Sequence, residues 1–394
     1  VHSAGEAWAV QPDAGVLVGV DTKSNQRVAS IQLGGEPRSV DATADGQLLI
    51  AACSRCNQVV VVDRASREVV QRFGESDGVG REPEHVVVSP DGSRAYVSAR
   101  VGDRVDVFER VADRFRYLKS VSVGRRPTGL SITPDSSRLF VAHFLPRGAL
   151  DSNEAWLSSI DTASLSVSEE PTIRDDGNPD AAGCLSQVAA FAGEPAAQLG
   201  FEAVPSQLAG VFLNPGGWMA WVPGLRIAGF PIFEGDPSPL GFQFLALGAN
   251  SPAMLFPMDT RNPARASFGR TPALVDITDR DEKFLECYPS IDDAEGVRVR
   301  DGNRASERIY PGVTIPSQGT LLSELGVARF VGWTRGGRRA LVLSFVGDEL
   351  AVTDGASFSA VANRHLLLSG SNPTRIAVTA AGTERYVTYE NSLY

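Results

Sequence analysis

The feature that most constrains the fold of this chain is a short pattern that recurs along it. Each copy is an alternating apolar run, a turn such as Ser-Pro-Asp-Gly, and a second alternating run. Alternation with a period of two is typical of half-buried strands, and Gly at the end of the turn supplies the positive φ that such turns need. We therefore predict a β-hairpin at each of 39–53, 85–99, 129–143, 210–224, 330–344 and 375–389.

A second strand pair follows most of these hairpins. Each is a strand that ends near an acidic residue, a polar turn and another strand, at 16–33, 59–73, 105–121, 156–169, 254–268 and 350–368. A proline tag such as GGEPRSV or GREPEHV often precedes the next copy. The hairpins that begin at 39, 85 and 129 are 46 and 44 residues apart, which suits the repeat length of four-stranded propeller blades.

The residues SPDGSRAYVSAR, VDVFERVADRF and VSVGRRPTGLSITPDSSRLFVAHF resemble the YVTN family of β-propeller repeats. The resemblance extends over about 30–170 and returns over about 325–390. It implies a β-propeller. YVTN-type propellers are often found at cell surfaces and are sometimes linked to di-haem cytochrome c peroxidase-like modules. The resemblance implies no particular activity, because propellers host many functions.

We predict one all-β propeller domain over 1–394, most simply with seven four-stranded blades and with long insertions in the middle blades. Six hairpins are readable, and a seventh blade begins at 270–288. Residues 375–394 begin a blade that 6–33 would complete, so the simplest ring closure joins the two termini and removes unpaired strand edges. The alternative is that the chain continues beyond Tyr394.

Two irregular insertions, at 171–253 and 286–326, break the repeat. Loops on a rigid scaffold often carry function, so four aromatic residues of the first insertion are our candidates for a recognition surface: Trp218, Trp221, Phe230 and Phe233. The alternative is that these side chains fill the space between blades. We interpret the charged second insertion as a solvent-exposed loop. The alternative is that four of its acidic residues bind calcium, although their spacing is not that of an EF-hand loop: Asp292, Asp293, Glu295 and Asp301.

Four cysteines suit two disulfides in an exported protein: Cys53, Cys56, Cys184 and Cys287. Cys53 and Cys56 are spaced for a disulfide across a turn, with free thiols or a metal or redox pair as alternatives. A bond between Cys184 and Cys287 would tie the two insertions together. A structural zinc site usually needs two close pairs, so we predict no metal. The start at Val1, without an initiator Met, suggests a processed and exported chain.

Composition argues against two kinds of partner. The net charge of −10 and the pI near 5.1 argue against nucleic acid, whose binding needs a basic surface. No apolar stretch approaches the roughly 18 residues that a transmembrane segment requires. We expect a periplasmic, extracellular or cell-surface location.

The sequence contains no Gly-x-Ser-x-Gly, His-Glu-x-x-His, Cys-x-x-Cys-His or phosphate-loop motif. His85 opens an inner strand and His143 closes a strand of the next blade, so we expect them toward opposite ends of their strands. Glu84, beside His85 at the mouth of a central channel, joins His85 as a candidate binding residue. Other carboxylates recur at turns and are interpreted as backbone caps: Asp21, Asp45, Asp63, Asp91, Asp135, Asp161 and Asp259.

These observations favour an exported, non-catalytic propeller that binds another protein, or another domain of the same polypeptide, without a cofactor. The family resemblance adds a cytochrome-like redox module to the partners that this interpretation implies. The alternative is a propeller enzyme of the lactonase or oxidoreductase type, with its site at the mouth of the central channel.

Overall fold

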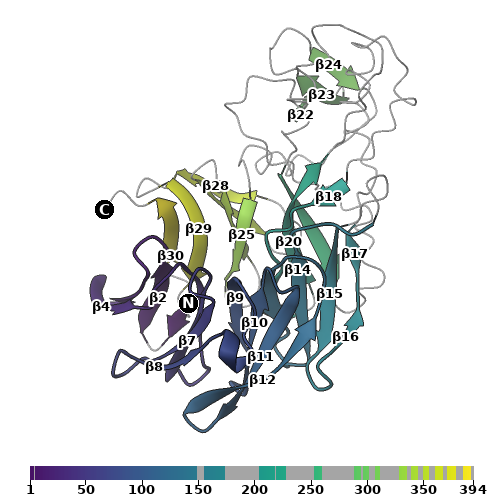
Figure 1. Ribbon diagram of the computed structural model, residues 1–394. Coiled ribbons are helices and arrows are strands. Elements are labelled where there is room, and N and C mark those ends of the chain that lie inside the picture. Colours follow the sequence, from purple (N-terminus) through teal and green to yellow (C-terminus); the bar gives the residue numbers. More distant parts are fainter. Residues whose placement is uncertain are drawn as a thin grey trace, which may run out of the picture.

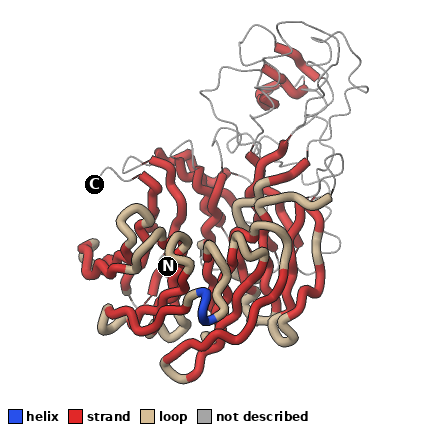
Figure 2. The backbone as a smooth tube through the Cα atoms, in the orientation of Figure 1, coloured by secondary structure: helices blue, strands red, loops and turns tan. Residues whose placement is uncertain are grey.

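A computed structural model gives the fold of the 394-residue chain (Figures 1 and 2). It describes residues 1–3, 5–148, 155–173, 204–217, 219–227, 253–259, 288–293, 296–300, 307–310, 328–334, 339–344, 349–354, 360–366, 371–378 and 385–391. Strands make up nearly all of the regular structure. The exception among the described residues is a short 3-10 helix, η1 (Glu75–Asp77).

The first four sheets are antiparallel and each is built from consecutive strands. Their strands are β1 (His2–Ser3), β2 (Glu6–Gln11), β3 (Val16–Asp21) and β4 (Gln26–Gln32); β5 (Pro37–Ala42), β6 (Leu48–Cys53), β7 (Gln58–Asp63) and β8 (Glu68–Phe73); β9 (Pro83–Val88), β10 (Arg94–Ala99), β11 (Arg104–Val111) and β12 (Arg114–Ser122); and β13 (Pro127–Ile132), β14 (Arg138–His143), β15 (Ala155–Asp161), β16 (Ser166–Glu169) and β17 (Thr172–Ile173).

The remaining strands form four more sheets. They are β18 (Val204–Ser206), β19 (Phe212–Leu213), β20 (Met219–Ile227) and β21 (Ala253–Asp259); β22 (Tyr288–Asp293), β23 (Gly296–Arg300) and β24 (Glu307–Tyr310); β25 (Ala328–Trp333), β26 (Arg339–Ser344), β27 (Glu349–Asp354) and β28 (Ala360–Leu366); and β29 (Ser371–Val378) and β30 (Arg385–Asn391).

Seven of the described sheets follow one another around a ring, and each is one blade. Strand β2 lies beside β5, and one strand of each following blade lies beside that of the next blade: β5, β9, β13, β19, β25 and β29, which we call the inner strands. Strand β30 returns to lie near β2. This arrangement is a β-propeller, as predicted. The sheet β22–β24 lies away from the ring (Figure 1).

All six predicted hairpins are antiparallel strand pairs: β5–β6, β9–β10, β13–β14, β19–β20, β25–β26 and β29–β30. Five of the second pairs are also present, as β3–β4, β7–β8, β11–β12, β15–β16 and β27–β28. Of 254–268, the structure describes only the first strand, within β21. The seventh blade start at 270–288 lies outside the described residues except for its last residue.

The recurring turn aspartates cap neighbouring groups, as predicted. Asp91 Oδ1 accepts hydrogen bonds from the Ser89 hydroxyl at 2.5 Å and from the Ser93 N–H at 2.9 Å. Asp45 and Asp135 accept equivalent bonds in their own turns. In the second kind of turn, the aspartate accepts the N–H of the serine three residues on, as at Asp21, Asp63 and Asp161. The side chain of Asp259 is outside the described part of the chain.

The middle strands of a blade are buried on both faces. In β6, Leu48 and Ile50 pack with the third blade, whereas Leu49 and Ala51 pack with the first. All six residues of β6 are buried. The alternating pattern predicts half-buried strands instead. The difference arises because a neighbouring blade covers each face of a blade.

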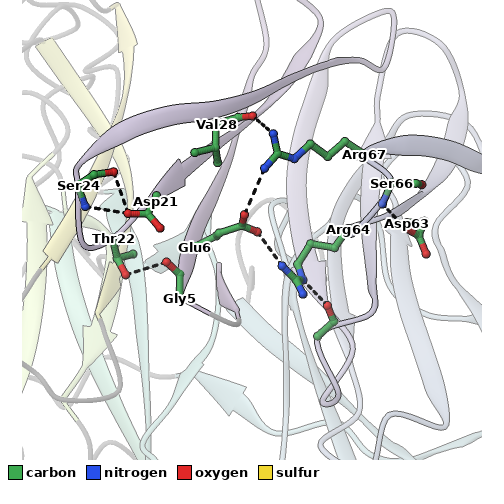
Figure 3. A network of polar contacts seen from close by, with 11 residues as sticks. Gly5, Glu6, Asp21, Thr22, Ser24, Val28, Asp63, Arg64, Ser66 and Arg67 are labelled. Atoms are coloured by element: carbon green, nitrogen blue, oxygen red, sulfur yellow. Dashed lines mark hydrogen bonds and ion pairs between the residues drawn. The ribbon is translucent and has the colours of Figure 1, made fainter.

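Charged residues join the first blade to the second (Figure 3). Glu6 of β2 forms ion pairs with Arg64 at 2.9 Å and with Arg67 at 3.8 Å. Arg64 Nε also donates to the carbonyl of Gly46 at 2.6 Å, and Arg67 donates to the carbonyl of Val28 on β4. The ion pairs of Glu6 and the bond from Arg67 to Val28 link the two blades beyond their apolar packing, while the bond to Gly46 holds Arg64 within the second blade.

The last described sheet and the first lie beside one another where the ring closes. Strands β29 and β30 form a two-stranded sheet of their own, while β1 pairs with β2 in the first sheet. The Tyr386 hydroxyl donates to Asn25 Oδ1 at 3.1 Å and lies 3.4 Å from the carbonyl of Thr22. Side chains therefore connect the last sheet to the first, because β1 already occupies the free edge of β2.

Cys53 and Cys56 form a disulfide across the turn between β6 and β7, which confirms one of the predicted alternatives. Gly35, at φ +52°, packs closely against this turn: a Cβ there would lie 2.7 Å from the Cys56 nitrogen. Cys184 and Cys287 lie outside the described residues.

Candidate functional site at the centre of the ring

Four titratable side chains on inner strands gather at the centre of the ring. Asp41 lies on β5, Glu84 and His85 lie on β9, and Arg375 lies on β29. The charge of Arg375 lowers the pKa of His85, although β29 and β9 are not neighbours in the ring. The charge of the Arg375 guanidinium therefore acts on His85, as it also does on Asp41. We call these four residues the central polar cluster, and all four are half-buried.

Side chains bridge the inner strands where no backbone pairing joins them. Ser39 Oγ on β5 accepts a hydrogen bond from the Val86 N–H on β9 at 3.3 Å. Asp41 Oδ2 accepts one from the Val88 N–H at 2.8 Å. Inner-strand N–H groups that face the next blade need such partners, since unpaired buried N–H groups are costly.

The same kind of bridge continues around the ring. His85 Nδ1 accepts a hydrogen bond from the Leu130 N–H at 3.3 Å, and Ser131 Oγ accepts one from the Leu213 N–H at 3.3 Å. Because Nδ1 is the acceptor, neutral His85 carries its proton on Nε2. Burial lowers the pKa of His85 well below its ordinary value, and the Arg375 charge lowers it further, so the ring is neutral at physiological pH.

Several opposing effects act on the pKa of the Asp41 carboxyl group. Burial raises the pKa of its carboxyl group. The N–H groups of Val88 and Ala42 and the positive charges of the Val1 amino group and Arg375 lower it, but burial prevails. The carboxyl group is thus used mainly as a hydrogen-bond acceptor between blades.

Arg375 is held by stacking. Its guanidinium carbon lies 5.6 Å from the ring centroid of Phe330, which packs edge-on against Phe212 at 4.6 Å between centroids. Burial lowers the pKa of Arg375, while the negative charges of Glu84 and Asp41 raise it. Within the described part of the chain, the guanidinium makes neither a hydrogen bond nor an ion pair.

Glu84 stands at a β-bulge. The register between β9 and β10 shifts between Ser98 and Ala99, so Glu84 has no residue directly opposite it. Equivalent register shifts occur in β5, between Pro37 and Ser39, and in β29, between Pro373 and Arg375. A bulge re-aims the side chain of its extra residue. Like Arg375, Glu84 makes no hydrogen bond or ion pair to a described residue.

Glu84 and His85, the two residues predicted at the channel mouth, are neighbours on the inner strand β9. Trp221 agrees with the alternative interpretation, in which the aromatic side chains fill space within the ring. It is fully buried and packs edge-on against Trp333, with ring centroids 5.3 Å apart, so it belongs to the core and not to a recognition surface. The reason is that its strand, β20, is paired on both sides, with β18, β19 and β21.

The other candidates cannot be placed in the same way. Trp218, Phe230 and Phe233 lie outside the described residues, as do Glu295 and Asp301. Asp292 and Asp293 lie in β22, where the backbone alone is described. In the part of the chain with described side chains, no group of three or more His, Cys, Asp or Glu residues is arranged to hold a metal ion.

Sequence reasoning missed Asp41 and Arg375. Aligning four inner strands on their prolines places Ser39, His85, Gly129 and Arg375 at the same position, two residues after Pro37, Pro83, Pro127 and Pro373. At this position two of the repeats have a small residue, Ser39 or Gly129, whereas the other two have an ionisable one. This departure from the repeat is the sequence signal that identifies Arg375, and it strengthens the choice of His85.

A second histidine lies in the core. His143 pairs with Pro127 and His85 pairs with Ser98, so both histidines lie at the same end of their blades. They do lie toward opposite ends of their own strands, as expected, and they share one end of the blade because the second strand runs antiparallel to the first. His143 Nε2 lies 2.9 Å from Ser158 Oγ, and its ring stacks on Trp156 at 4.2 Å.

The contact between His143 and Ser158 is closed to solvent. His143 is 2% exposed and Ser158 is fully buried. Burial lowers the pKa of His143 to about 3. This pair therefore packs the fourth blade and is out of reach of a substrate.

Comparisons with known proteins concern the fold. The chain is similar to hydrazine synthase of Kuenenia stuttgartiensis, with a TM-score of 0.64 and 14% identity over 98% of this chain and 90% of that one. It is also similar to a protein of unknown function from Desulfotomaculum acetoxidans, with a TM-score of 0.52 and 10% identity over 99% and 88% of the two chains. No protein-family model and no curated protein sequence matches the chain. At such identities the likeness extends to the fold alone.

Among the described residues, no helix is long and apolar enough to cross a membrane.

Proposed function

We propose that this chain is an exported, non-catalytic β-propeller that serves as a scaffold for another protein or for another domain of the same polypeptide. The proposal rests on one observation: the hydrogen-bond acceptors of the central polar cluster bind the neighbouring blades. Asp41 and His85 Nδ1 both accept hydrogen bonds from the next blade, so both side chains help to join the blades. The single lone pair of His85 Nδ1 is used in this way, and a general base needs a free one.

The sheet β22–β24 supports a binding role. It is formed by 288–310, inside the second insertion, and lies away from the rigid ring (Figure 1). Segments that a rigid scaffold presents in this way commonly contact partners. We propose this sheet as part of the partner surface.

The Cys53–Cys56 disulfide supports export. Disulfides persist mainly in oxidising compartments such as the periplasm and the extracellular space. The resemblance to YVTN repeats agrees with such a location and suggests a cytochrome-like module as one class of partner.

A pull-down from the native source, with cross-linking and quantitative mass spectrometry, tests the scaffold role. We expect a partner to be recovered with the full chain and to fall at least about tenfold when a short Gly-Ser linker replaces 288–310. A chain with its 112–113 turn replaced is the matched control and should recover the partner fully. Thermal unfolding must show that both variants keep the ring. Equal recovery with all three chains would contradict this role for β22–β24.

An enzymatic role is the second candidate, since the charge of Glu84 acts on Arg375 and neither side chain makes a hydrogen bond or an ion pair to a described residue. It predicts that hydrolysis of sugar lactones, or another turnover, is lost in Glu84→Gln. Activity that persists in this variant would rule out Glu84 as its acid or base.

A further inference from the structure

We infer that a hollow at one end of the third blade, which we call the third-blade hollow, binds a small organic carboxylate. It has a volume of about 320 Å³ and is lined by residues of the β8–β9 loop between Glu75 and Arg81, by Gly102 of the β10–β11 turn and by Arg104, the first residue of β11. Ligand pockets in proteins have volumes from about 300 Å³ upward. The third-blade hollow shares no residue with β22–β24 or with the central polar cluster, so the inference goes beyond the scaffold role.

A difference between two blades leaves the third-blade hollow open. In the second blade, the Cys53–Cys56 disulfide lies in the β6–β7 turn and packs against Gly35. The third blade has Gly102 at the position of Cys56, since Ala99, like Cys53, pairs with the proline of its inner strand. Because Gly102 has no side chain, the β10–β11 turn does not fill the space beside it.

A buried carboxylate holds Arg104 in position. Arg104 Nε lies 3.0 Å from Oδ1 of Asp106, whose side chain has no exposed surface, and Arg104 Nη2 donates to the carbonyl of Gly78. Asp106 is fixed in turn, because its Oδ2 accepts the N–H of Gly80 at 2.7 Å. The side chain of Arg104 is nevertheless 28% exposed and lines the third-blade hollow. A guanidinium oriented in this way presents the N–H groups that these contacts do not use to a ligand.

Arg81 adds a second guanidinium at the rim. Its Nε lies 3.0 Å from Oε1 of Glu75, which belongs to η1, the helix drawn in blue in Figure 2. The side chain of Arg81 is 68% exposed. Arg81 and Arg104 are thus both paired through Nε, and both line one small hollow. Guanidinium groups bind carboxylate oxygens with strong, directional hydrogen bonds, so this arrangement suits a carboxylate ligand.

The charges around the third-blade hollow favour a ligand with a single negative charge. Each arginine already has one carboxylate partner, Glu75 or Asp106. A phosphate dianion would be repelled by Glu75 more strongly than a carboxylate with one charge. The volume equals that of roughly ten water molecules in the liquid, which limits the ligand to a small molecule.

Fluorine NMR of the purified full chain at neutral pH tests the inference, with para-fluorobenzoate as the probe. We expect saturable binding at one site per chain, seen as broadening of the probe signal. Para-fluorobenzamide has nearly the same shape but no charge, and it should bind at least about tenfold more weakly. Inorganic phosphate should displace the probe less well than unlabelled benzoate does. The experiment needs no protein partner, so its outcome is separate from that of the scaffold role.

Variants assign the binding to the third-blade hollow. Arg81→Met and Arg104→Lys should each weaken probe binding about tenfold or more, because the lysine keeps a positive charge but lacks the planar guanidinium. Gly102→Leu should weaken it too: a Cβ at this position would make ordinary contacts, 3.4 Å from Arg104 Cγ, and a larger side chain would take up space in the hollow. Arg55→Met is the matched control, because it removes an exposed guanidinium that pairs through Nε with Glu36 at 2.8 Å. It should bind the probe like the wild type.

Thermal unfolding must show that each variant keeps its fold. If Arg104→Lys unfolds, Arg81→Met still decides, since Arg81 is exposed and its loss leaves no buried charge unpaired. Absence of saturable probe binding, equal binding of para-fluorobenzamide, stronger displacement by phosphate than by benzoate, or unchanged affinity in Arg81→Met would overturn the inference.

Discussion

At the scale of single residues, the surroundings of a carboxyl group decide its protonation. Asp45 and Asp106 each contact an arginine, at 2.8 Å and 3.0 Å. For the partly exposed Asp45, burial raises the pKa, but bonds from Arg110 and the turn outweigh it and the pKa falls to about 2. For Asp106, which is fully buried, burial prevails over Gly80 and Arg104 and raises the pKa to about 6.

Asp106 therefore makes stability depend on pH. Its pKa in the folded state is above the unfolded value of 3.8, so its contribution is complete below about pH 4 and is lost as pH rises through about 6. We expect Asp106→Asn to remove up to roughly 3 kcal/mol of this pH dependence, at about 1.4 kcal/mol per pKa unit. Denaturant unfolding from pH 4.5 to 8 measures it. If the free energy of unfolding changed equally with pH in the wild type and in Asp106→Asn, Asp106 would not be the source of the pH dependence.

Gly124 is a position where no side chain fits. A Cβ there would lie 1.9 Å from the ring of Trp156. We expect Gly124→Ala to destabilise the protein by about 1–3 kcal/mol or more, because the buried Trp156 must move. Gly74→Ala is the control, since its Cβ would meet nothing closer than 3.9 Å. Thermal unfolding compares the two, and equal melting temperatures would refute the expected clash.

At the scale of elements, the hairpin turns owe their shape to local hydrogen bonds. The pKa of Asp91 is lowered first by the Ser89 hydroxyl and then by the Ser93 N–H, and Asp135 has the same surroundings one blade later. A carboxylate that recurs at the same turn position in successive blades stabilises the repeat. Its recurrence is thus explained without catalysis.

We expect Asp91→Ala to lower the free energy of unfolding by about 1 kcal/mol at pH 7, which is typical of a lost local hydrogen-bond cap. Because the folded-state pKa of Asp91 is depressed, the loss should shrink as pH falls below 4. Asp113→Ala is the control, since Asp113 lies in the β11–β12 turn without a hydrogen bond to a described residue. Urea unfolding at pH 7 and pH 3.5 checks this, and equal losses for both variants would be inconsistent with the capping role.

At the scale of the whole molecule, each blade is stable only between its neighbours. Ile50 of the second blade packs against Val86 and Val97 of the third, and all three are almost completely buried. We expect Ile50→Ala to cost about 2–5 kcal/mol and to lower amide protection in both blades together. Val70→Ala, at a position 39% exposed, is the control. Hydrogen exchange measures the effect, and loss of protection in the second blade alone would argue against coupled blades.

The strands could be predicted from the sequence more fully than the candidate site, because the site depends on how the blades pack into a ring. Alternation and turn residues act over a few positions, so all six hairpins could be predicted from the sequence. Trp221 lies both in the predicted hairpin at 210–224 and in the segment interpreted as an insertion, and local alternation does not show which faces of a strand other strands cover. Its burial depends on strands β18, β19 and β21, which pair with its own.

The amino-acid sequence alone specifies the hairpins, the caps at their turns and the repeat that makes a propeller, because each depends on neighbouring residues. It also marks Glu84 and His85 as exceptions to the repeat. The meeting of these two residues with Asp41 and Arg375 is a property of the folded ring. Arg375 follows His85 by 290 positions, and the two come together because closure of the ring directs both inner strands toward one centre.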